Sequence, residues 1–308
     1  MSEPINSDRQ ELFAVLAIDK PAGITSRDCV NHIQRLLRGK RRSDIPKIGH
    51  TGTLDPMATG VLLIALGKAT RLVEFSHLQR KRYLAEFLLG QTSDTLDTEG
   101  QVVQLEDPPI IQRETWLKEL SNWRGSIRQT PPQYSACKVD GKRAYELARQ
   151  GVEFELASRE VFIHQLELID FEYPRVSMSI DCSSGTYIRS LGHDIATALG
   201  SAAVMSKLQR TSVGVYELSA CCQLDDLRSG DDVRQAATGP LGLVAELPRI
   251  EVSSSELQRL RNGQILRASD HSNIDVTAEV IVAVDAHQQL VAILQRRADS
   301  LQPVRVFL

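Results

Sequence analysis

The chain lacks the features of membrane-spanning and disulfide-linked secreted proteins. Its longest apolar run, Val61 to Leu66, is too short to cross a bilayer as a helix. The N-terminal segment has no basic start followed by an apolar stretch, so we expect no secretion signal. The 308 residues include five cysteines, an odd number without C-x-x-C spacing. This usage favours reduced thiols and a cytoplasmic location over a disulfide framework.

Motifs for metal and cofactor chemistry are also missing from the sequence. The seven histidines are scattered, without an H-E-x-x-H pattern or a histidine–cysteine pair at ligand spacing. Neither the dinucleotide loop G-x-G-x-x-G nor the nucleophile elbow G-x-S-x-G occurs. Gly67-Lys68 lacks the other residues of a phosphate-binding loop, and the S-x-x-K pattern at Ser135 lacks its companion motifs. We therefore expect no metal ion and no cofactor.

Excess charge of one sign is also lacking, because the formal net charge is only -3. Screening limits charge interactions to about 8 Å at physiological salt, so local clusters are the better guide to a charged partner. One cluster lies between Asn31 and His50, and the second is Arg80-Lys81-Arg82. The first comprises Arg35, Arg38, Lys40, Arg41, Arg42 and Lys47. Such runs are more often solvated surface than nucleic-acid contacts, so other features must decide.

Helix and strand signals alternate irregularly along the first three quarters of the chain. A capping box, Thr25-Ser26-Arg27-Asp28, predicts the start of a helix that Gly39 would end. Apolar residues at helical spacing predict another helix from Ile188, which Gly200 would end. The expected strands span residues 61–66, 83–89 and 176–182. This mixture predicts an α+β fold with a mixed or antiparallel sheet flanked by helices.

The tail reads as a small β-rich module. One short helix, Ser254 to Arg261, precedes the strand-like runs VIVAVD and LVAILQ, which a turn around His287 separates. We therefore expect one domain over residues 1–246 and a second over residues 247–308. The longest candidate linker is the polar stretch from Arg228 to Gly239.

One carboxylate stands out in the segment KIGHTGTLDPMATGVL, residues 47–62. Asp55 is the only acid there, and it follows a loop of glycine and threonine and precedes an apolar strand. Alone, an Asp-Pro pair is most simply a turn. However, Thr51, Gly52 and Thr53 can bury little, so packing does not explain the loop. The following strand would hold Asp55 on a rigid element, as a functional site requires.

Arg189 is a second oddity. It falls in the first turn of its predicted helix, where the helix dipole disfavours a cation by about 0.3–1 kcal/mol. A guanidinium and the Asp55 carboxylate could form a bidentate pair. Such a pair would keep the acid ionised at neutral pH, as a nucleophile must be. The two residues together predict a catalytic centre.

Six blocks of the sequence resemble the bacterial tRNA pseudouridine-55 synthase family, known as TruB. GHTGTLDPMATGVL is similar to that family's catalytic-aspartate signature. The other blocks, in the family's order, are DKPAGITS, KRY, TPPQYSACKVDGKRAYELARQG, SSGTYIRSLGHDIA and LQRTSVG. The resemblance implies a pseudouridine-synthase-like catalytic domain with an RNA-gripping insertion near residues 125–155. It also implies that residues 247–308 form a PUA-like RNA-binding module.

The resemblance further implies an isomerase that acts on the uridine at position 55 in the T-loop of tRNA. The uridine would be flipped out, and its glycosidic bond would be broken and re-formed to give pseudouridine. Asp55 would be the catalytic aspartate and Arg189 its partner, while Tyr83 would stack on the uracil and serve proton removal at C5. Among the residues grouped with substrate binding, His50 would lie against the RNA, and Lys20 would sit near the site as structural support. The base pocket would include Tyr187 and Leu208.

This reaction needs no cofactor, because nothing is oxidised and no group is donated, and this agrees with the lack of cofactor motifs in the sequence. Extruding the uridine costs a few kcal/mol, and stacking on an aromatic ring returns about 1–3 kcal/mol per base. Direct attack of Asp55 on C1′ and a glycal intermediate both remain open, and both need the acid ionised. The expected partner is the T-loop and stem of tRNA, bound by a monomer without guide RNA. The alternative is a non-catalytic tRNA-binding or folding factor on the same scaffold.

Overall fold

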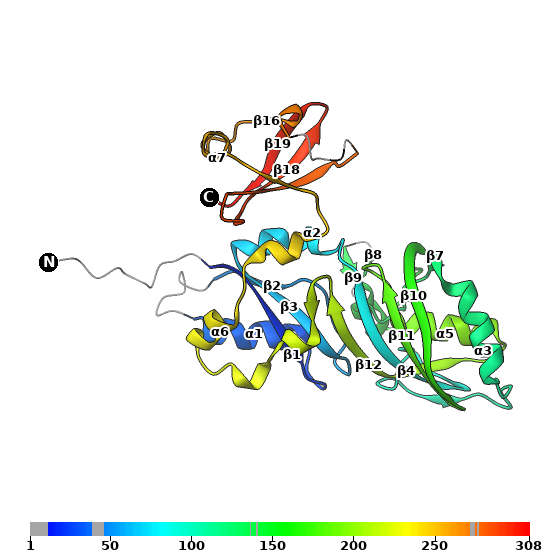
Figure 1. Ribbon diagram of the computed structural model, residues 1–308. Helices are drawn as coiled ribbons and strands as arrows, with labels where there is room; N and C mark the ends of the chain where they lie inside the picture. Colours follow the sequence, from blue (N-terminus) through cyan, green and yellow to red (C-terminus); the bar gives the residue numbers. More distant parts are fainter. Residues whose placement is uncertain (1–11, 39–45, 136, 140, 272–274, 276) are drawn as a thin grey trace.

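A mixed β-sheet runs through the larger body of the molecule (Figure 1). The computed structural model describes residues 12–38, 46–135, 137–139, 141–271, 275 and 277–308. Within these residues the sheet has ten strands, and its main path is β14-β1-β3-β12-β4-β11-β10-β7, with β2 beside β3 and β13 beside β12. The strands are β1 (Phe13–Lys20), β2 (Ile48–His50), β3 (Thr59–Gly67), β4 (Lys81–Leu89), β7 (Gly125–Gln129), β10 (Arg159–Glu172), β11 (Arg175–Cys182), β12 (Ala203–Val213), β13 (Tyr216–Glu217) and β14 (Cys222–Gln223).

Strand directions confirm the predicted α+β class with a mixed sheet. The pairs β1–β14 and β3–β12 are parallel, and the other pairs of this sheet are antiparallel. Two short hairpins lie outside it, β5 (Gln91–Thr92) with β6 (Val103–Gln104) and β8 (Lys138–Val139) with β9 (Lys142–Arg143). The apolar run predicted as a strand at 61–66 is the centre of β3, which is buried on both faces.

Short helices accompany the sheet. The α-helices of the body are α1 (Ser26–Leu36), α2 (Val73–Ser76), α3 (Arg113–Leu120), α4 (Ala144–Arg149), α5 (Ile188–Ala198) and α6 (Gly230–Ala236). The 3-10 turns of the body are η3 (Lys68–Leu72), η4 (Ser121–Trp123), η5 (Leu218–Ala220), η6 (Leu224–Asp226) and η7 (Pro240–Val244). Helix α5 packs on β12 and β4, and α3 packs on β10, so both cover the same half of the sheet (Figure 1).

Helix α1 begins as the capping box predicts. The Thr25 Oγ1 accepts from the backbone N–H of Asp28 at 3.1 Å, and Asp28 Oδ2 accepts from the N–H of Thr25 at 3.0 Å. The helix ends earlier than expected, at Leu36, because Leu37 already leaves the helical backbone at a ψ of 1°. The predicted stop at Gly39 and the basic residues 40–42 lie outside the described part of the chain.

Helix α5 rests directly on β4 because Gly192 has no side chain. A Cβ at that position would overlap the ring of Phe87. The helix buries Ile188, Leu191 and Ile195 as predicted, and Gly200 follows it with a φ of +75°. This close approach fixes the first turn of α5, which carries Arg189, relative to the centre of the sheet.

The predicted linker at 228–239 is wrong, because most of it is helix α6. The hydroxyl of Ser229 caps this helix by accepting from the N–H of Asp232, and the Asp232 carboxylate accepts from the N–H of Ser229. Val233 is fully buried on its inner face. A polar composition therefore concealed a short helix with an N-terminal capping box, which packs against α1 and β1 before the chain enters the module.

The second sheet forms a small module that stands on the body (Figure 1). Its strand order is β15-β17-β18-β19-β16, with helix α7 (Ser254–Arg261) at the predicted bounds. The strands are β15 (Arg249–Glu251), β16 (Leu266–Arg267), β17 (Val280–Val284), β18 (Leu290–Arg297) and β19 (Ser300–Val306), with the turn η8 (Ala268–Asp270) after β16.

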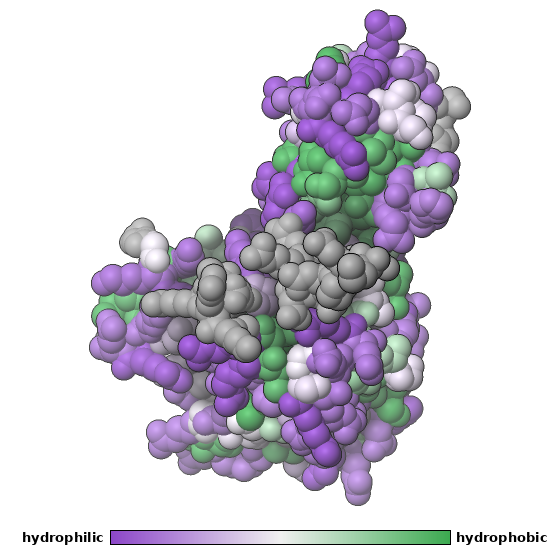
Figure 2. All heavy atoms as spheres, turned by 90° about the vertical axis from the view of Figure 1, so that its left-hand side faces the viewer, coloured by the Kyte–Doolittle hydropathy of each residue, from purple (hydrophilic) through white to green (hydrophobic). Residues whose placement is uncertain are grey.

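A continuous apolar core joins the module to the body. It combines residues of β1, β3 and η3 with residues of β17 and β18, including Val61, Leu63, Val282 and Ile293. The ring of Phe307 stacks on Phe13 with centroids 4.7 Å apart. In the space-filling view, apolar side chains gather where module and body meet, on a face that is otherwise largely hydrophilic (Figure 2). In the described part of the chain, no helix has both the length and the apolar character needed to span a membrane.

Candidate active site

A cleft of about 1480 Å³ crosses the sheet between the start of α1 and the start of α5. Segments far apart in the chain line it, including residues 50–56, 94–101 and 134–135 and the turn before α5. Of the predicted site residues, the cleft brings together His50, Asp55, Tyr83, Tyr187, Arg189 and Leu208. Lys20 is not part of its lining.

Asp55 and Arg189 form an ion pair at the base of the cleft. The Nε of Arg189 lies 3.0 Å from Asp55 Oδ2, and its Nη2 donates to Oδ1 at 3.5 Å. Two guanidinium nitrogens thus face the two carboxylate oxygens, as a bidentate pair does. The Asp55 side chain keeps 33% of its surface exposed, whereas that of Arg189 keeps 6%. The acid can therefore reach a molecule in the cleft while the guanidinium behind it is fixed.

Further contacts clamp the Arg189 guanidinium. Its Nη1 donates to the carbonyl of Thr95 at 2.6 Å and lies 3.3 Å from Asp97 Oδ2, and Nη2 donates to the carbonyl of Tyr134 at 3.0 Å. Asp97 is itself buried, and its Oδ1 accepts from the N–H of Glu99. The orientation of Arg189, and through it that of Asp55, is therefore set by two loops that the sequence pattern did not connect.

Opposing influences act on the pKa of Asp55. Burial raises this pKa above its ordinary value because desolvation disfavours the charged form, and the negative charge of Asp97 adds to the rise. The adjacent guanidinium of Arg189 lowers it. The net direction is upward, so the expectation that pairing alone keeps Asp55 a strong acid is incomplete. The carboxyl is poised instead as a weaker acid than an exposed aspartate.

Tyr83 lies on β4 with its side chain directed into the cleft and only 7% exposed. Burial raises the pKa of its phenol, and the positive charge of Arg210 acts against that rise. On the neighbouring strand β12, Leu208 is 8% exposed and shares the cleft wall with Tyr83. The two side chains offer a flat aromatic and an aliphatic surface for a base.

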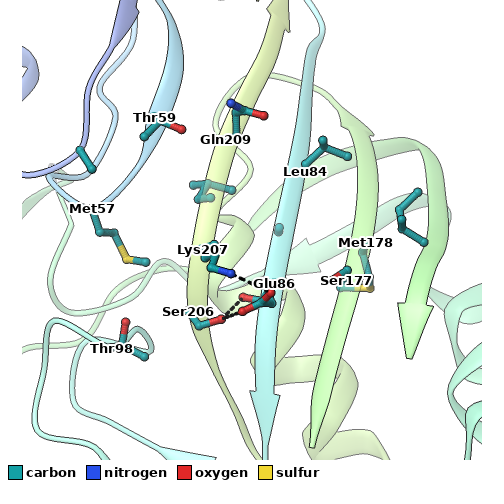
Figure 3. A pocket seen from close by; sticks show the side chains of 14 residues that line it. Met57, Thr59, Leu84, Glu86, Thr98, Ser177, Met178, Ser206, Lys207 and Gln209 are labelled. Carbon is teal, nitrogen blue, oxygen red and sulfur yellow. Dashed lines mark hydrogen bonds and ion pairs between the residues drawn. The ribbon is translucent and has the colours of Figure 1, made fainter. Parts of the chain in front are cut away.

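The opposite face of these strands carries a different set of side chains. Leu84 and Glu86 of β4 and Lys207 and Gln209 of β12 surround a separate hollow of about 560 Å³ (Figure 3). There the Lys207 ammonium lies 3.2 Å from Glu86 Oε2. Because side chains alternate along a strand, this arrangement leaves Tyr83, Leu208 and Arg210 on the cleft side.

Lys20 supports the catalytic loop from inside the protein. It is fully buried, and its ammonium donates to the carbonyls of Pro21 at 2.8 Å, Ile24 at 2.7 Å and Pro56 at 3.1 Å. This burial leaves Lys20 no surface for a contact with RNA and gives it the position of a structural support. Its three bonds instead fix the backbone immediately after Asp55.

His50 and Tyr187 both line the cleft. Burial lowers the pKa of His50, and the nearby charges of Arg27, Arg210 and Arg143 lower it further, so the imidazole is neutral at neutral pH. Tyr187 precedes α5, and its backbone N–H and carbonyl both bond the Gln129 side chain, at 2.7 and 3.0 Å. The guanidinium carbon of Arg159 lies 4.8 Å from the centre of the Tyr187 ring.

The basic residues are distributed differently from the expected surface clusters. Within Arg80-Lys81-Arg82, strand alternation buries Lys81 in the cleft and leaves Arg82 outside, paired with Glu217 at 3.2 Å. The Lys81 ammonium donates to Ser184 Oγ at 2.5 Å, and burial lowers its pKa to about 8. Other cations of the cleft lining are Arg27, Arg143, Arg149, Arg159 and Arg210.

Sequence reasoning missed Asp97, Arg210 and Lys81 as individual site residues. Two of them lie inside the blocks KRY and LQRTSVG, but neither block shows which side chain turns inward. Asp97 lies in the segment DTLDTEG, which carried no distinguishing pattern. Among the described residues, no three histidine, cysteine or acidic side chains are close enough to hold a metal ion.

Two family models cover most of the body. Residues 40–188 match the TruB family pseudouridylate synthase N-terminal domain, and residues 189–235 match the tRNA pseudouridylate synthase B C-terminal domain. The boundary between the two falls between Ile188 and Arg189, at the start of α5.

The sequences of similar proteins align with nearly the whole chain. A tRNA pseudouridine synthase B from Clostridium tetani is 36% identical over 95% of this chain and 98% of its own length. One from Dehalococcoides mccartyi is 37% identical over 96% of both chains. The crystal structure of a Cbf5-Nop10-Gar1 complex contains a chain that aligns with a TM-score of 0.74 and 26% identity, covering 96% of this chain and 85% of that one.

Proposed function

The chain belongs to the TruB family of pseudouridylate synthases and isomerises uridine in tRNA to pseudouridine, and we propose that its target is the uridine at position 55 in the T-loop. The relatives named tRNA pseudouridine synthase B support tRNA as the substrate. One observation carries the catalytic assignment, namely the Asp55–Arg189 ion pair beside Tyr83 at the base of one cleft. A partly exposed acid held by a buried, fixed cation is suited to act on a ribose that enters the cleft.

The reaction exchanges one bond for another within the nucleotide. The flipped uridine enters the cleft, with its base against the ring of Tyr83 and the side chain of Leu208. Asp55 assists cleavage of the N1–C1′ bond, either by attack on C1′ or through a glycal. The uracil then turns, a C5–C1′ bond forms, the C5 proton leaves and N1 gains a proton. No atom is lost overall, which is an isomerisation.

Contacts on both sides of Asp55 position it for this chemistry. The guanidinium of Arg189 holds both carboxylate oxygens, and its bonds to Thr95 and Tyr134 prevent it from turning away. On the other side of the acid, Lys20 fixes the carbonyl of Pro56. An acid fixed from both sides needs little rearrangement when the ribose arrives, which lowers the barrier.

The cations of the cleft and the exposed arginines of the module would hold the RNA backbone. Arg27, Arg143 and Arg149 line the cleft around the Asp55 site, where the phosphates beside the flipped nucleotide would pass. In this proposal residues 125–155 grip the RNA, residues 247–308 form a PUA-like RNA-binding module, and a monomer acts without guide RNA. His50 and Tyr187 would border the flipped nucleotide.

A position-mapped pseudouridine assay on unmodified tRNA tests the proposal. Purified protein alone should convert the T-loop uridine of a bare transcript, and Asp55→Asn should form no product while binding the tRNA within a few-fold of wild type. Asp231→Asn is a matched control, because Asp231 is exposed on α6 and pairs with Arg234, its one ion-pair partner among the described residues.

Three outcomes would contradict parts of this assignment. Product formed by the Asp55→Asn protein would remove Asp55 from the chemistry, and product at another uridine would change the target. Failure of wild-type protein on bare tRNA, with activity restored by an added RNA, would show dependence on a guide. The alternative of a non-catalytic tRNA-folding factor predicts no pseudouridine from any variant.

A further inference from the structure

Arg210 is a buried cation at the centre of the sheet. Its residue surface is only 2% exposed, and its guanidinium donates to three backbone carbonyls. The Nε bonds Val61 at 2.7 Å, Nη2 bonds Gly52 at 3.2 Å and Nη1 bonds Thr53 at 3.4 Å. Two of these carbonyls belong to the loop that carries Asp55, and the third belongs to β3, which follows that loop.

Arg210 makes no ion pair with a carboxylate among the described residues. Burying a charge without an opposite charge is unfavourable, and an apolar residue of similar volume would pack at least as well. The carbonyl bonds offset part of this cost, but they do not require a full positive charge beside the cleft. The charge itself therefore calls for a role that a neutral side chain could not fill.

The phenol of Tyr83 is the group beside this charge. Arg210 on β12 and Tyr83 on β4 are directly paired residues of antiparallel strands, so their side chains lie next to each other on the same face. That face is the cleft side, since Gln209 and Leu84, the next pair along, border the hollow on the other side (Figure 3).

Several other titratable groups surround this pair. Cys182 on β11 and Asp55 face Tyr83, and both raise the pKa of its phenol, as does burial. Lys81 on β4 and His50 on β2 face Arg210. Among the groups of the described residues that act on Tyr83, the positive charge of Arg210 lowers the pKa of the phenol, although burial keeps the net direction upward.

We propose that Arg210 is a positioning residue for the isomerisation, which ties the Asp55 loop to β12 and stabilises the Tyr83 phenolate that takes the C5 proton. In that step the C5–H bond breaks, its electron pair restores the uracil ring, and the proton ends on the phenolate oxygen. The rate of the step follows the fraction of Tyr83 that is ionised. The assignment rests on the proposed function, in which Tyr83 removes this proton.

The test replaces Tyr83 by 3,5-difluorotyrosine, whose phenol titrates near neutral pH and reports its charge by ¹⁹F NMR. With Arg210 present, the probe should titrate at the lowest pH. In Arg210→Met the midpoint should rise by roughly one unit or more, because a nearby positive charge is lost. Arg210→Lys should fall between the two, since its ammonium keeps the charge but cannot bond all three carbonyls.

A matched control and a second readout separate positioning from simple stability. The same probe at Tyr173, which packs beside Pro108 near Gly90, should titrate identically in all three proteins. In single-turnover assays with unlabelled protein, Arg210→Met should lose about tenfold or more in rate at neutral pH. Its rise in rate with pH should also move to higher pH, whereas a purely structural defect would lower the rate equally at every pH.

An unchanged midpoint at Tyr83 in a folded Arg210 variant would overturn the inference. If Arg210→Met does not fold, the comparison of Arg210→Lys with wild type decides the matter, and equal midpoints overturn it. The titration needs no tRNA, so its failure is distinct from failure of the isomerase assignment. That assignment depends instead on the product assay with Asp55→Asn.

Discussion

At the scale of single residues, Asp55 links acidity to activity. Its pKa is raised by burial and by the charge of Asp97, and it is lowered by Arg189, with a net rise above the ordinary value of an aspartate. Asp55 acts as a carboxylate, which predominates only above its pKa. Activity is therefore lost as the pH falls through the raised pKa of Asp55. The loss therefore begins at a higher pH than for an ordinary aspartate.

We expect the single-turnover rate to fall on the acid side at a pH above the ordinary aspartate range. Asp97→Asn removes a negative charge near Asp55, so it should move this acid limb to lower pH, whatever it does to the maximal rate. Single-turnover rates measured across the acid range, on protein shown to stay folded at each pH, give the midpoint of the acid limb and the maximal rate. A limb that stays fixed in Asp97→Asn, or moves with the control Asp231→Asn, would contradict the electrostatic account.

The sequence was informative about Asp55 and Arg189 because each broke a local expectation. Asp55 stood alone in a loop with little to bury, and Arg189 stood where a helix dipole disfavours a cation. Asp97 and Arg210 broke no local rule. Their importance comes from burial and from partners more than ninety residues away, such as Arg189 for Asp97 and Gly52 for Arg210. Such pairings depend on the strand order, which no local pattern contains.

At the scale of elements, the contact between β3 and β12 controls the site. The two strands run parallel, and Gly60 of β3 pairs with Arg210 of β12. Gly60 has a φ of +102°. A Cβ there would overlap the carbonyl of Arg210. Any side chain would thus push apart the strand that follows Asp55 and the strand that carries Leu208 and Arg210.

Gly60→Ala should lower the free energy of unfolding by at least about 2 kcal/mol, because it adds both backbone strain and a clash with a strand. It should lower the rate of isomerisation as well. Chemical denaturation measures the first effect and single turnover the second. Gly49→Ala is the control, since Gly49 has open space around it and an ordinary φ. Equal stability of the two variants would show that the strands can separate without cost.

Element types were predicted better than their ends. The helix at 254–261 and the strand at 176–182 followed from clear periodicity, and the structure confirms both. The helix hidden in 228–239 was missed because polar and acidic residues dominate it, and its stability comes from the Ser229 cap and from one buried valine. A helix of seven residues with one buried valine contains too few apolar residues to show a helical periodicity.

At the scale of the whole molecule, the module and the body share one core. Val282, Ile293 and Phe307 cover Val61 and Leu63 on the face of the sheet away from the cleft. The sequence predicted a separate β-rich tail, but it contained no sign of this contact. Both faces of β3 are buried, which a continuous apolar run permits but does not assign to a partner.

Deletion of the chain after Leu247 should therefore damage the body itself. It exposes a contiguous apolar face, so we expect a lower melting temperature and aggregation, measured by thermal scanning and light scattering. The proposed RNA-binding role is better tested by Arg261→Gln, Arg267→Gln and Arg297→Gln, which are exposed. These changes should weaken tRNA binding and reduce its salt dependence while the melting temperature stays near wild type. A soluble, stable truncated protein would contradict the shared core.

The order of strands has a consequence for synthesis of the protein. β12 lies between β3 and β4, although the ribosome completes it long after both have emerged. Until then the nascent chain presents two unpaired strand edges, which are the surfaces that chaperones protect from aggregation. Asp55 also waits for Arg189, which is translated shortly before β12. A chain that lacks β12 is therefore both prone to aggregation and inactive, and the active site can form only after Val213 has been synthesised.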